Sequence, residues 1–242
     1  QKLFELPKGL LESLLDLAAN LLYESYLVIE EVYQQQSLLS SPDLMELHGL
    51  FLRKESKGLV PRKLSKDFAK NISLLGLEDR PQQLDFAEKI EQLLEEHQTS
   101  FIQAQTGLGK TYGYLLPALN LESQTGILVS VPTKILQNQI MQEEGQRLKE
   151  VFHLEIHSLK GPQNYLKLDA FHRVLHRPES NRLFTRFKMQ LLIWLTETET
   201  GDLDEIGQLY RYQHFLPELV HDGKLSKKSL FATEDFWKRG QE

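Results

Sequence analysis

Leucine residues recur at steps of three and four along residues 7–35, PKGLLESLLDLAANLLYESYLVIEEVYQQ. This spacing places apolar side chains on one face of a helix, so the stretch is predicted to be helical. Another helix start is expected at Ser41-Pro42-Asp43, with Ser41 as the N-cap and Pro42 in the first turn. The pattern predicts that residues 1–70 form a helical linker or packing segment.

The pattern changes after Glu78, where helical repeats alternate with short apolar runs. An amphipathic helix is expected after Pro81, with Leu84, Ala87 and Ile90 on one face. The elements expected after it are a strand over 100–105, a helix over 111–121, a strand over 126–131, a helix over 133–149 and a strand over 151–157. This alternation predicts an α/β fold with a parallel sheet.

Composition narrows the class of protein. The 242 residues are 40% hydrophobic and 26% charged, which is ordinary for a globular protein, and the net charge is −6. No apolar run approaches the ~18 residues of a membrane span and no signal peptide opens the chain, so a cytoplasmic protein without a membrane partner is expected. The absence of cysteine excludes disulfides, thiolate zinc sites and cysteine-ligated iron–sulfur clusters within the chain. Because it begins with Gln1 and stops in charged sequence, the chain is expected to be an internal piece of a longer protein.

A turn of small residues joins the first predicted strand to the helix at 111–121. Its sequence, AQTGLGKT, matches the phosphate-loop pattern with Ala in place of the first Gly, and consists of Ala104, Gln105, Thr106, Gly107, Leu108, Gly109, Lys110 and Thr111. Gly107 and Gly109 let backbone N–H groups face phosphates without a clashing Cβ. Lys110 supplies a cation for the β- and γ-phosphates, and the Thr111 hydroxyl can bind Mg²⁺. The loop predicts a nucleotide site; the alternative is a glycine-rich turn that ends in Gly-Lys-Thr by chance.

Hydrolysis also needs carboxylates that hold Mg²⁺ and orient the attacking water. No hydrophobic run ending in Asp-Glu follows residue 111. The nearest candidate, LLIWLTETE at 191–199, is better interpreted as a helix and lacks the Asp. Either the site is degenerate or the catalytic acids lie beyond Glu242, and the abrupt end favours the second interpretation.

Three further segments flank the loop in a specific order. They are Arg80-Pro81-Gln82-Gln83 upstream, VSVPTKILQNQI at 129–140, and Leu159-Lys160-Gly161-Pro162-Gln163-Asn164-Tyr165-Leu166. Together with AQTGLGKT, this order resembles superfamily 2 helicases of the XPD/DinG branch, most closely the bacterial DinG-type helicases. The resemblance covers roughly residues 75–242.

The resemblance implies roles for individual residues. Arg80 and Gln83 would recognise adenine, and a Gln amide can both donate to and accept from the adenine edge. Pro132-Thr133 begins the motif that touches the single-strand backbone in these helicases, where Thr133 and helix N–H groups could bind phosphate, and Lys134 is a candidate for contact with DNA beside it. Lys160 and Asn164 are the remaining candidates for contact with DNA. A surface pair at a helix start is the alternative for Arg80 and Gln83, and a simple N-cap is the alternative for Thr133.

One departure from the family pattern concerns the iron–sulfur cluster. In many relatives a Lys-Gly-x-x-Asn-Tyr stretch leads into the first of four cysteines that ligate a [4Fe–4S] cluster. Here Leu166-Lys167-Leu168 takes that place, so no cluster is expected and helical packing would replace its bracing. The chain resembles the Gram-positive DinG-type proteins, in which an epsilon-like 3′–5′ exonuclease domain precedes the helicase module.

Residues 160–190 carry more basic than acidic side chains, and aromatic residues are interleaved among them. Such a surface suits nucleic acid, although a solvated helical face is an equal alternative. The acidic stretch 196–205 is interpreted as a loop between helices, and no histidine has the spacing of a metal ligand.

The sequence thus predicts a RecA-like phosphate-loop lobe of an ATP-dependent DNA helicase that uses ATP and Mg²⁺ on single-stranded or tailed DNA. The predicted parts are a helical segment (1–70), the first ATP-binding lobe (75–158), a helical insertion (159–235) and a return toward the lobe (236–242). Two alternatives stay open: a nucleotide-regulated exonuclease whose helicase-like module does not unwind DNA, and an unrelated phosphate-loop ATPase. The sequence does not reveal the oligomeric state.

Overall fold

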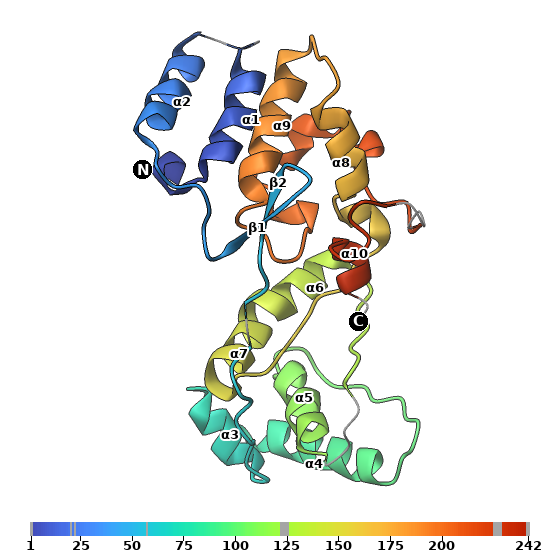
Figure 1. Ribbon diagram of the computed structural model, residues 1–242. Helices are drawn as coiled ribbons and strands as arrows, with labels where there is room; N and C mark the ends of the chain where they lie inside the picture. The colour runs from blue at the N-terminus through green and yellow to red at the C-terminus, as the bar shows by residue number, and fades with distance from the viewer. Residues whose placement is uncertain are drawn as a thin grey trace. The chain divides into compact units, whose positions relative to one another are not determined.

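The computed structural model describes residues 2–19, 21, 23–56, 58–121, 126–224 and 229–240 (Figure 1). Contacts divide the chain into two units. We call residues 1–56 with 159–242 the helical unit, and residues 57–158 the loop unit. The segment predicted as helical over 1–70 contributes to both units.

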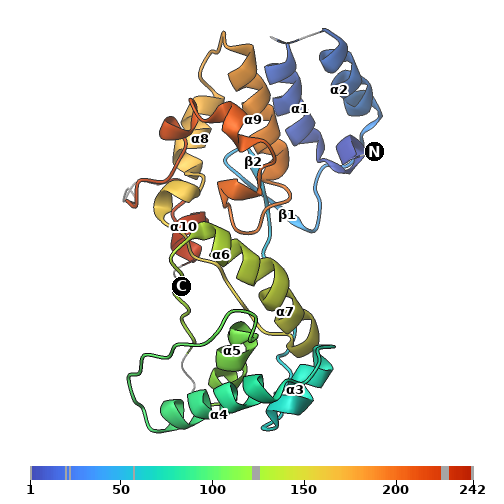
Figure 2. The same ribbon diagram turned by 180° about the vertical axis from the view of Figure 1, so that it is seen from behind.

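The helical unit is built around α1 (Lys8–Ala18) and α9 (Arg182–Trp194), which pack against each other. Both ribbon views place α1 between α9 and α2 (Tyr23–Gln35) (Figures 1 and 2). The helices predicted over 7–35 are therefore confirmed. The unit also contains α8 (Leu168–Leu175), α10 (Phe236–Arg239) and 3₁₀ turns at Lys2–Glu5, Pro162–Asn164, Leu203–Glu205, Leu209–Tyr212 and Leu216–Glu218.

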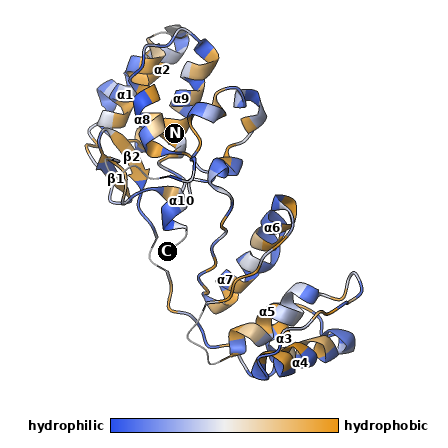
Figure 3. Ribbon diagram, turned by 90° about the vertical axis from the view of Figure 1, so that its right-hand side faces the viewer, coloured by the Kyte–Doolittle hydropathy of each residue, from blue (hydrophilic) through white to orange (hydrophobic). Residues whose placement is uncertain are grey.

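The core of the helical unit follows from the amphipathic pattern of its helices. Apolar and polar residues alternate along the ribbons (Figure 3). Helix α1 buries Leu10, Leu11 and Leu14 against α9 and its neighbours. From α9, the Phe187 ring stacks on Tyr212 with centroids 4.2 Å apart, which ties the 3₁₀ turns to the helix.

A β-hairpin replaces the helix that was expected to start at Ser41. Strands β1 (Leu44–Leu47) and β2 (Leu50–Arg53) pair antiparallel, with Leu47 opposite Leu50. The turn between them is His48-Gly49, and both residues have positive φ, 50° and 80°. A two-residue turn of this hand matches the twist of the paired strands, and burial of Leu50 and Leu52 fixes the register.

The loop unit contains the helices predicted on either side of the phosphate loop. They are α3 (Phe68–Leu74), α4 (Pro81–Glu95), α5 (Lys110–Asn120), and the continuous run α6 (Lys134–Ile140), π-helical turn Met141–Gly145 and α7 (Gln146–Phe152). Helix α4 packs against α5, and Ala87, Leu116 and Phe152 belong to the shared core. The predicted helices after Pro81, at 111–121 and at 133–149 are confirmed.

The structure does not confirm the predicted parallel sheet. Segments 100–105 and 126–131 form no strand ladder within the described residues, and the expected strand at 151–157 begins inside α7. Phe101 and Leu128 are 102% and 92% exposed, although a strand of a parallel sheet is buried on both faces. These segments have the composition of strands but no neighbouring strand in the described part of the chain.

An ion pair on the surface of the helical unit predicts how its stability changes in acid. Lys167 Nζ lies 2.6 Å from Asp222 Oδ1, which also accepts the Lys224 backbone N–H at 3.1 Å. The Lys167 hydrogen bond and then that N–H lower the pKa of Asp222 from 3.8 to about 2. A lowered carboxyl pKa gives stability that is present above about pH 4 and is lost as pH falls toward 2.

We therefore expect Asp222→Asn to lower the free energy of unfolding at pH 6 by only about 0.5–1 kcal/mol, because the Asp222 side chain is 59% exposed. The difference from the unsubstituted chain should shrink as the pH falls from 4 to 2.5, as measured by urea unfolding. Asp16→Asn, which removes an exposed carboxylate from α1, is the control. A pH-independent difference for Asp222→Asn would contradict the prediction.

Candidate nucleotide-binding site

The phosphate-loop sequence adopts a backbone that needs its two glycines. Gly107 and Gly109 have φ of +80° and +79°, a left-handed conformation that residues with a Cβ adopt at a cost. Gly109 is the N-cap of α5, so Lys110 and Thr111 occupy the first helical turn. Residues 104–111 thus form a glycine turn that leads into an eleven-residue helix, as the sequence predicts.

The two residues predicted to recognise adenine lie against this loop. Gln83 is buried and donates its amide N–H to the Gly109 carbonyl at 2.8 Å. Arg80 donates through Nη1 to the Gly107 carbonyl at 3.0 Å. A Cβ on Gly109 would lie only 2.3 Å from Gln83 Nε2, so the glycine also permits this close contact. The structure therefore brings Arg80, Gln83 and the loop into one site.

Lys110 is folded over the loop that precedes it. Its Nζ donates to the carbonyls of Gln105 at 2.9 Å and Ala104 at 3.3 Å. Carbonyl oxygens are weaker partners for an ammonium group than phosphate oxygens. The ammonium group can exchange these two contacts for an anion in the cradle, and Thr111 stands half-buried beside it.

The candidates for DNA contact fall in two places. Thr133 is the exposed N-cap of α6, and its hydroxyl accepts the Leu136 backbone N–H at 3.2 Å. Lys134 is exposed at the first position of that helix. Asn164 belongs to the helical unit and donates to the Gly161 carbonyl at 2.9 Å, in a 3₁₀ turn.

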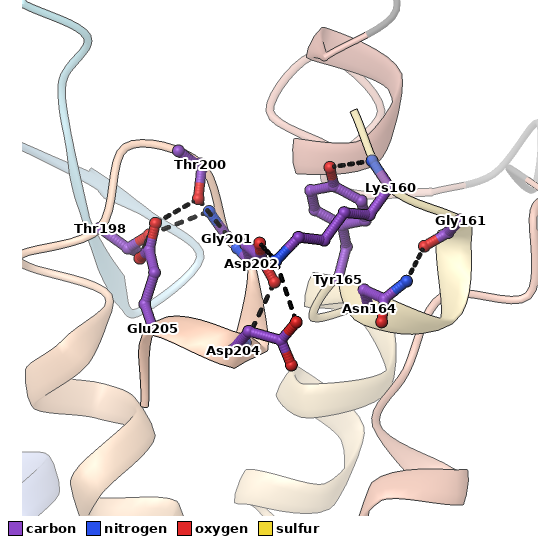
Figure 4. A network of polar contacts seen from close by, with 10 residues as sticks. All are labelled: Lys160, Gly161, Asn164, Tyr165, Thr198, Thr200, Gly201, Asp202, Asp204 and Glu205. Atoms are coloured by element: carbon purple, nitrogen blue, oxygen red, sulfur yellow. Dashed lines mark hydrogen bonds and ion pairs between the residues drawn. The ribbon is translucent and has the colours of Figure 1, made fainter. Parts of the chain in front are cut away.

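Lys160 has a structural environment that the sequence did not predict. Its side chain is 3% exposed, and Nζ lies 2.6 Å from Asp202 Oδ2 and 2.9 Å from Asp204 Oδ2 (Figure 4). Burial disfavours its charge, but hydrogen bonds to both carboxylates outweigh this, so the pKa of Lys160 is raised. Its backbone N–H donates to Tyr165 Oη at 2.9 Å. An ammonium group that two carboxylates already neutralise is poorly placed to bind phosphate, which argues against the predicted contact with DNA.

The acidic stretch 196–205 is an ordered loop that holds this lysine. Glu205 accepts hydroxyl hydrogen bonds from Thr198 at 2.6 Å and Thr200 at 2.5 Å, and Thr198 also accepts the Gly201 N–H. A Thr-x-Thr-Gly-Asp sequence was the available signal for such a turn. No group of three potential ligands suited to a metal ion occurs among the described residues, and none of the helices described there has the length and apolar character of a membrane span.

Residues 191–199, considered above as a source of catalytic acid, lie at the end of α9. Leu191 and Leu192 are buried in the core of the helical unit, and Trp194 ends the helix. Their interpretation as helix is confirmed for residues 191–194, whereas residues 195–199 lie beyond the end of the helix. No carboxylate of the described residues is in hydrogen-bond contact with Lys110.

Comparisons with known proteins agree with the resemblance deduced from sequence. Residues 82–201 match the DEAD/DEAH box helicase family. The chain is 32% identical over 221 residues to a Staphylococcus saprophyticus protein named 3′-5′ exonuclease DinG, which covers 85% of this chain. It is 33% identical over 219 residues to the protein of that name from Staphylococcus aureus strain RF122, covering 86% of this chain. The chain spans only 24% of the length of each of these relatives. No solved structure matches.

These similarities settle two points about the sequence. The resemblance to the DinG-type proteins is confirmed, and the family match implies a RecA-like α/β fold. That fold has a β-sheet beside the phosphate loop. The exposed segments 100–105 and 126–131 have the composition of strands of such a sheet.

Proposed function

We propose that this chain, a DinG-type helicase sequence, forms the ATP-binding lobe of an ATP-dependent DNA helicase that acts on single-stranded or tailed DNA. The observation that carries the proposal is the phosphate-loop cradle, with two left-handed glycines, Lys110 at the helix start, and Arg80 and Gln83 bonded to the loop.

The residues present fit a nucleoside triphosphate with Mg²⁺. Side chains larger than hydrogen at Gly107 and Gly109 would strain the turn, and at Gly109 would also meet Gln83. Lys110 would exchange two carbonyl contacts for β- and γ-phosphate oxygens, and Thr111 would supply a hydroxyl ligand to the metal. The metal supplies charge neutralisation at the phosphates when bound.

Gln83 would serve the nucleotide in two ways, through adenine and through the loop. One amide N–H already supports Gly109, while the amide oxygen and the second N–H remain for a base edge. Occupation of the adenine site would thus be coupled to the position of the loop.

This coupling gives a test that does not involve adenine. Gln83→Ala removes the Gly109 hydrogen bond, so inorganic tripolyphosphate should bind about three- to tenfold more weakly, in line with one lost hydrogen bond. The measurement is competition with a fluorescent nucleotide in the full-length protein. Gln82→Ala, at the exposed neighbouring position, is the matched control. Equal tripolyphosphate affinity in both variants would leave Gln83 with a role at adenine alone.

The rest of the full-length protein would complete the ATP-binding lobe. The apolar segments 100–105 and 126–131 have no strand partner in the described part of the chain, and the chain spans 24% of the length of its relatives. We infer that further strands pair with 100–105 and 126–131 in the full-length protein and bring the carboxylates that hydrolysis requires. Residues 159–235 of the helical unit would then be an insertion that stands where cluster-bearing relatives ligate iron and sulfur; the chain itself contains no cysteine.

Single-stranded DNA would be gripped at the start of α6. The exposed Thr133 and Lys134 offer a hydroxyl group and a cation to backbone phosphates. Lys160 is not part of this proposal, because its charge is buried between two carboxylates.

A second candidate function is a nucleotide-regulated exonuclease whose helicase-like module does not unwind DNA. The name of the staphylococcal relatives, 3′-5′ exonuclease DinG, favours it. An unrelated phosphate-loop ATPase is disfavoured by the same matches.

One gel separates the two candidates. The full-length protein is incubated with a tailed duplex that carries a labelled strand, with and without ATP. A full-length displaced strand that appears only with ATP supports the helicase. A ladder of shortened strands without displacement supports the exonuclease and refutes the helicase proposal.

A further inference from the structure

A cavity of about 450 Å³ lies in the helical unit, along one face of α9. Arg186, Gln190, Ile193 and Glu197 line it, at the three- and four-residue steps that share a helix face. Residues 205–207, Leu21 and Ser25 line its other sides, and the cavity is open to solvent. The volume falls in the range of small-molecule sites, so the cavity can hold one nucleotide-sized group.

The carboxylate of Glu205, which lines this cavity, is held in one orientation by hydrogen bonds. The two carboxylate oxygens of Glu205 accept the hydroxyl groups of Thr198 and Thr200, as Figure 4 shows. Each oxygen retains a lone pair, so the carboxylate is a fixed double acceptor beside the cavity. Preorganisation of this kind lowers the entropy cost of binding a group with two adjacent donors.

The other polar groups of the cavity include donors that lack acceptors. Trp194 also lines it, is 8% exposed, and its indole N–H has no hydrogen-bond partner among the described residues. The Arg186 guanidinium is exposed at the cavity, and no ion pair involves it in the described part of the chain. Glu197 is neutralised by an ion pair with Lys2. The cavity therefore combines a rim cation with an oriented carboxylate and apolar walls.

We propose that this cavity binds a guanine nucleotide, supplied as an unstacked base of single-stranded DNA. Unstacked bases are commonly held in pockets that read their Watson–Crick edges. Arg186 would hold the phosphate at the rim, while the base enters between Ile193 and Glu205. The negative charge of Glu205 would keep the phosphate itself out of the interior of the cavity. This inference rests on the proposed action on DNA and adds a base preference to it.

Guanine fits the donor pattern better than the other bases. Its N1–H and N2–H groups are adjacent and parallel, so both can donate to the two oxygens of Glu205. Thymine offers one N–H on that edge, and adenine and cytosine offer one amino group. Gln190 can serve the remaining polar atoms of the base, because its amide both donates and accepts.

The test measures binding of the full-length protein to a labelled dT12 strand and to the same strand with one central dG, without ATP. We expect about tenfold tighter binding of the dG strand, the size of a good bidentate base contact. Glu205→Gln should abolish the preference and leave dT12 binding unchanged. Glu31→Gln, at an exposed glutamate of α2, is the matched control and should retain the preference.

A second variant fills the cavity without cutting its polar network. Gly207 lines the cavity, and a Cβ there would meet nothing within 4 Å, so Gly207→Phe can be accommodated and should remove the dG preference. Equal binding of both strands by the unsubstituted protein would overturn the proposal while leaving DNA binding intact. Binding of free dGMP that responds to Gly207→Phe, without any dG preference in strands, would overturn the assignment to DNA. Absence of binding to either strand would instead refute the proposed action on DNA, and the base preference with it.

Discussion

Lys110→Ala is expected to reduce ATP turnover of the full-length protein by roughly a hundredfold or more. Removing one positioned charge donor from a transition state commonly has an effect of this size. Among the described residues the ammonium group contacts two loop carbonyls and no carboxylate, so its removal leaves no partner charge behind there. Alanine is also a strong helix former, and α5 should begin as before.

The measurement is phosphate release with and without single-stranded DNA, beside a thermal unfolding curve for each variant. Lys89→Ala removes an exposed lysine from α4 and serves as the charge-matched control. Unchanged turnover in Lys110→Ala would refute the assignment of the loop. Loss of turnover together with an undiminished ladder of shortened DNA strands would show that nuclease action does not depend on this site.

The phosphate loop could be predicted because its chemistry is local. Gly107, Gly109 and Lys110 lie within four residues, and each residue type is required by a backbone angle or a charge at that position. The helices on either side were predictable for the same reason, since a repeat of three and four residues is contained within each element. Gln83 was predicted to recognise adenine, and its hydrogen bond to the Gly109 carbonyl was not predicted.

Strands could be predicted less well because pairing depends on distant sequence. Segment 126–131 has the composition of a strand, yet the described chain offers it no neighbour. The hairpin at 44–53 was missed because Ser41-Pro42 is also a common helix start. The His48-Gly49 turn between apolar runs was the signal that could have identified it.

The partners of Lys160 lie beyond any local pattern, since Asp204 is 44 residues downstream. The sequence predicts that Lys160, which precedes the Gly-x-x-Asn-Tyr stretch, contacts DNA. Only the folded chain shows that the loop at 202–204 supplies two carboxylates to it. The two interpretations, structural and DNA-binding, make different predictions for the same substitution.

Lys160→Met is expected to lower the free energy of unfolding by about 3 kcal/mol. Removal of one partner from a buried ion pair leaves an uncompensated charge, and here two carboxylates would face each other. The raised pKa of Lys160 makes its contribution fully present below about pH 10.5 and lost only at higher pH. The loss should therefore be the same at pH 7 and pH 9. Arg173→Met, at an exposed position of α8, controls for the change in charge.

Combining Lys160→Met with Asp202→Asn and Asp204→Asn distinguishes the two roles. If the ion-pair cluster is structural, the triple variant regains most of the lost stability, because no unpaired charge remains. Its affinity for single-stranded DNA should then equal that of the unsubstituted protein. Regained stability with DNA affinity reduced severalfold would show that Lys160 leaves its carboxylates to bind phosphate, as the sequence alone predicts. The ion pairs of Lys160 with Asp202 and Asp204 would in that case be reversible contacts, and competition between the two carboxylates and a DNA phosphate would set the position of Lys160.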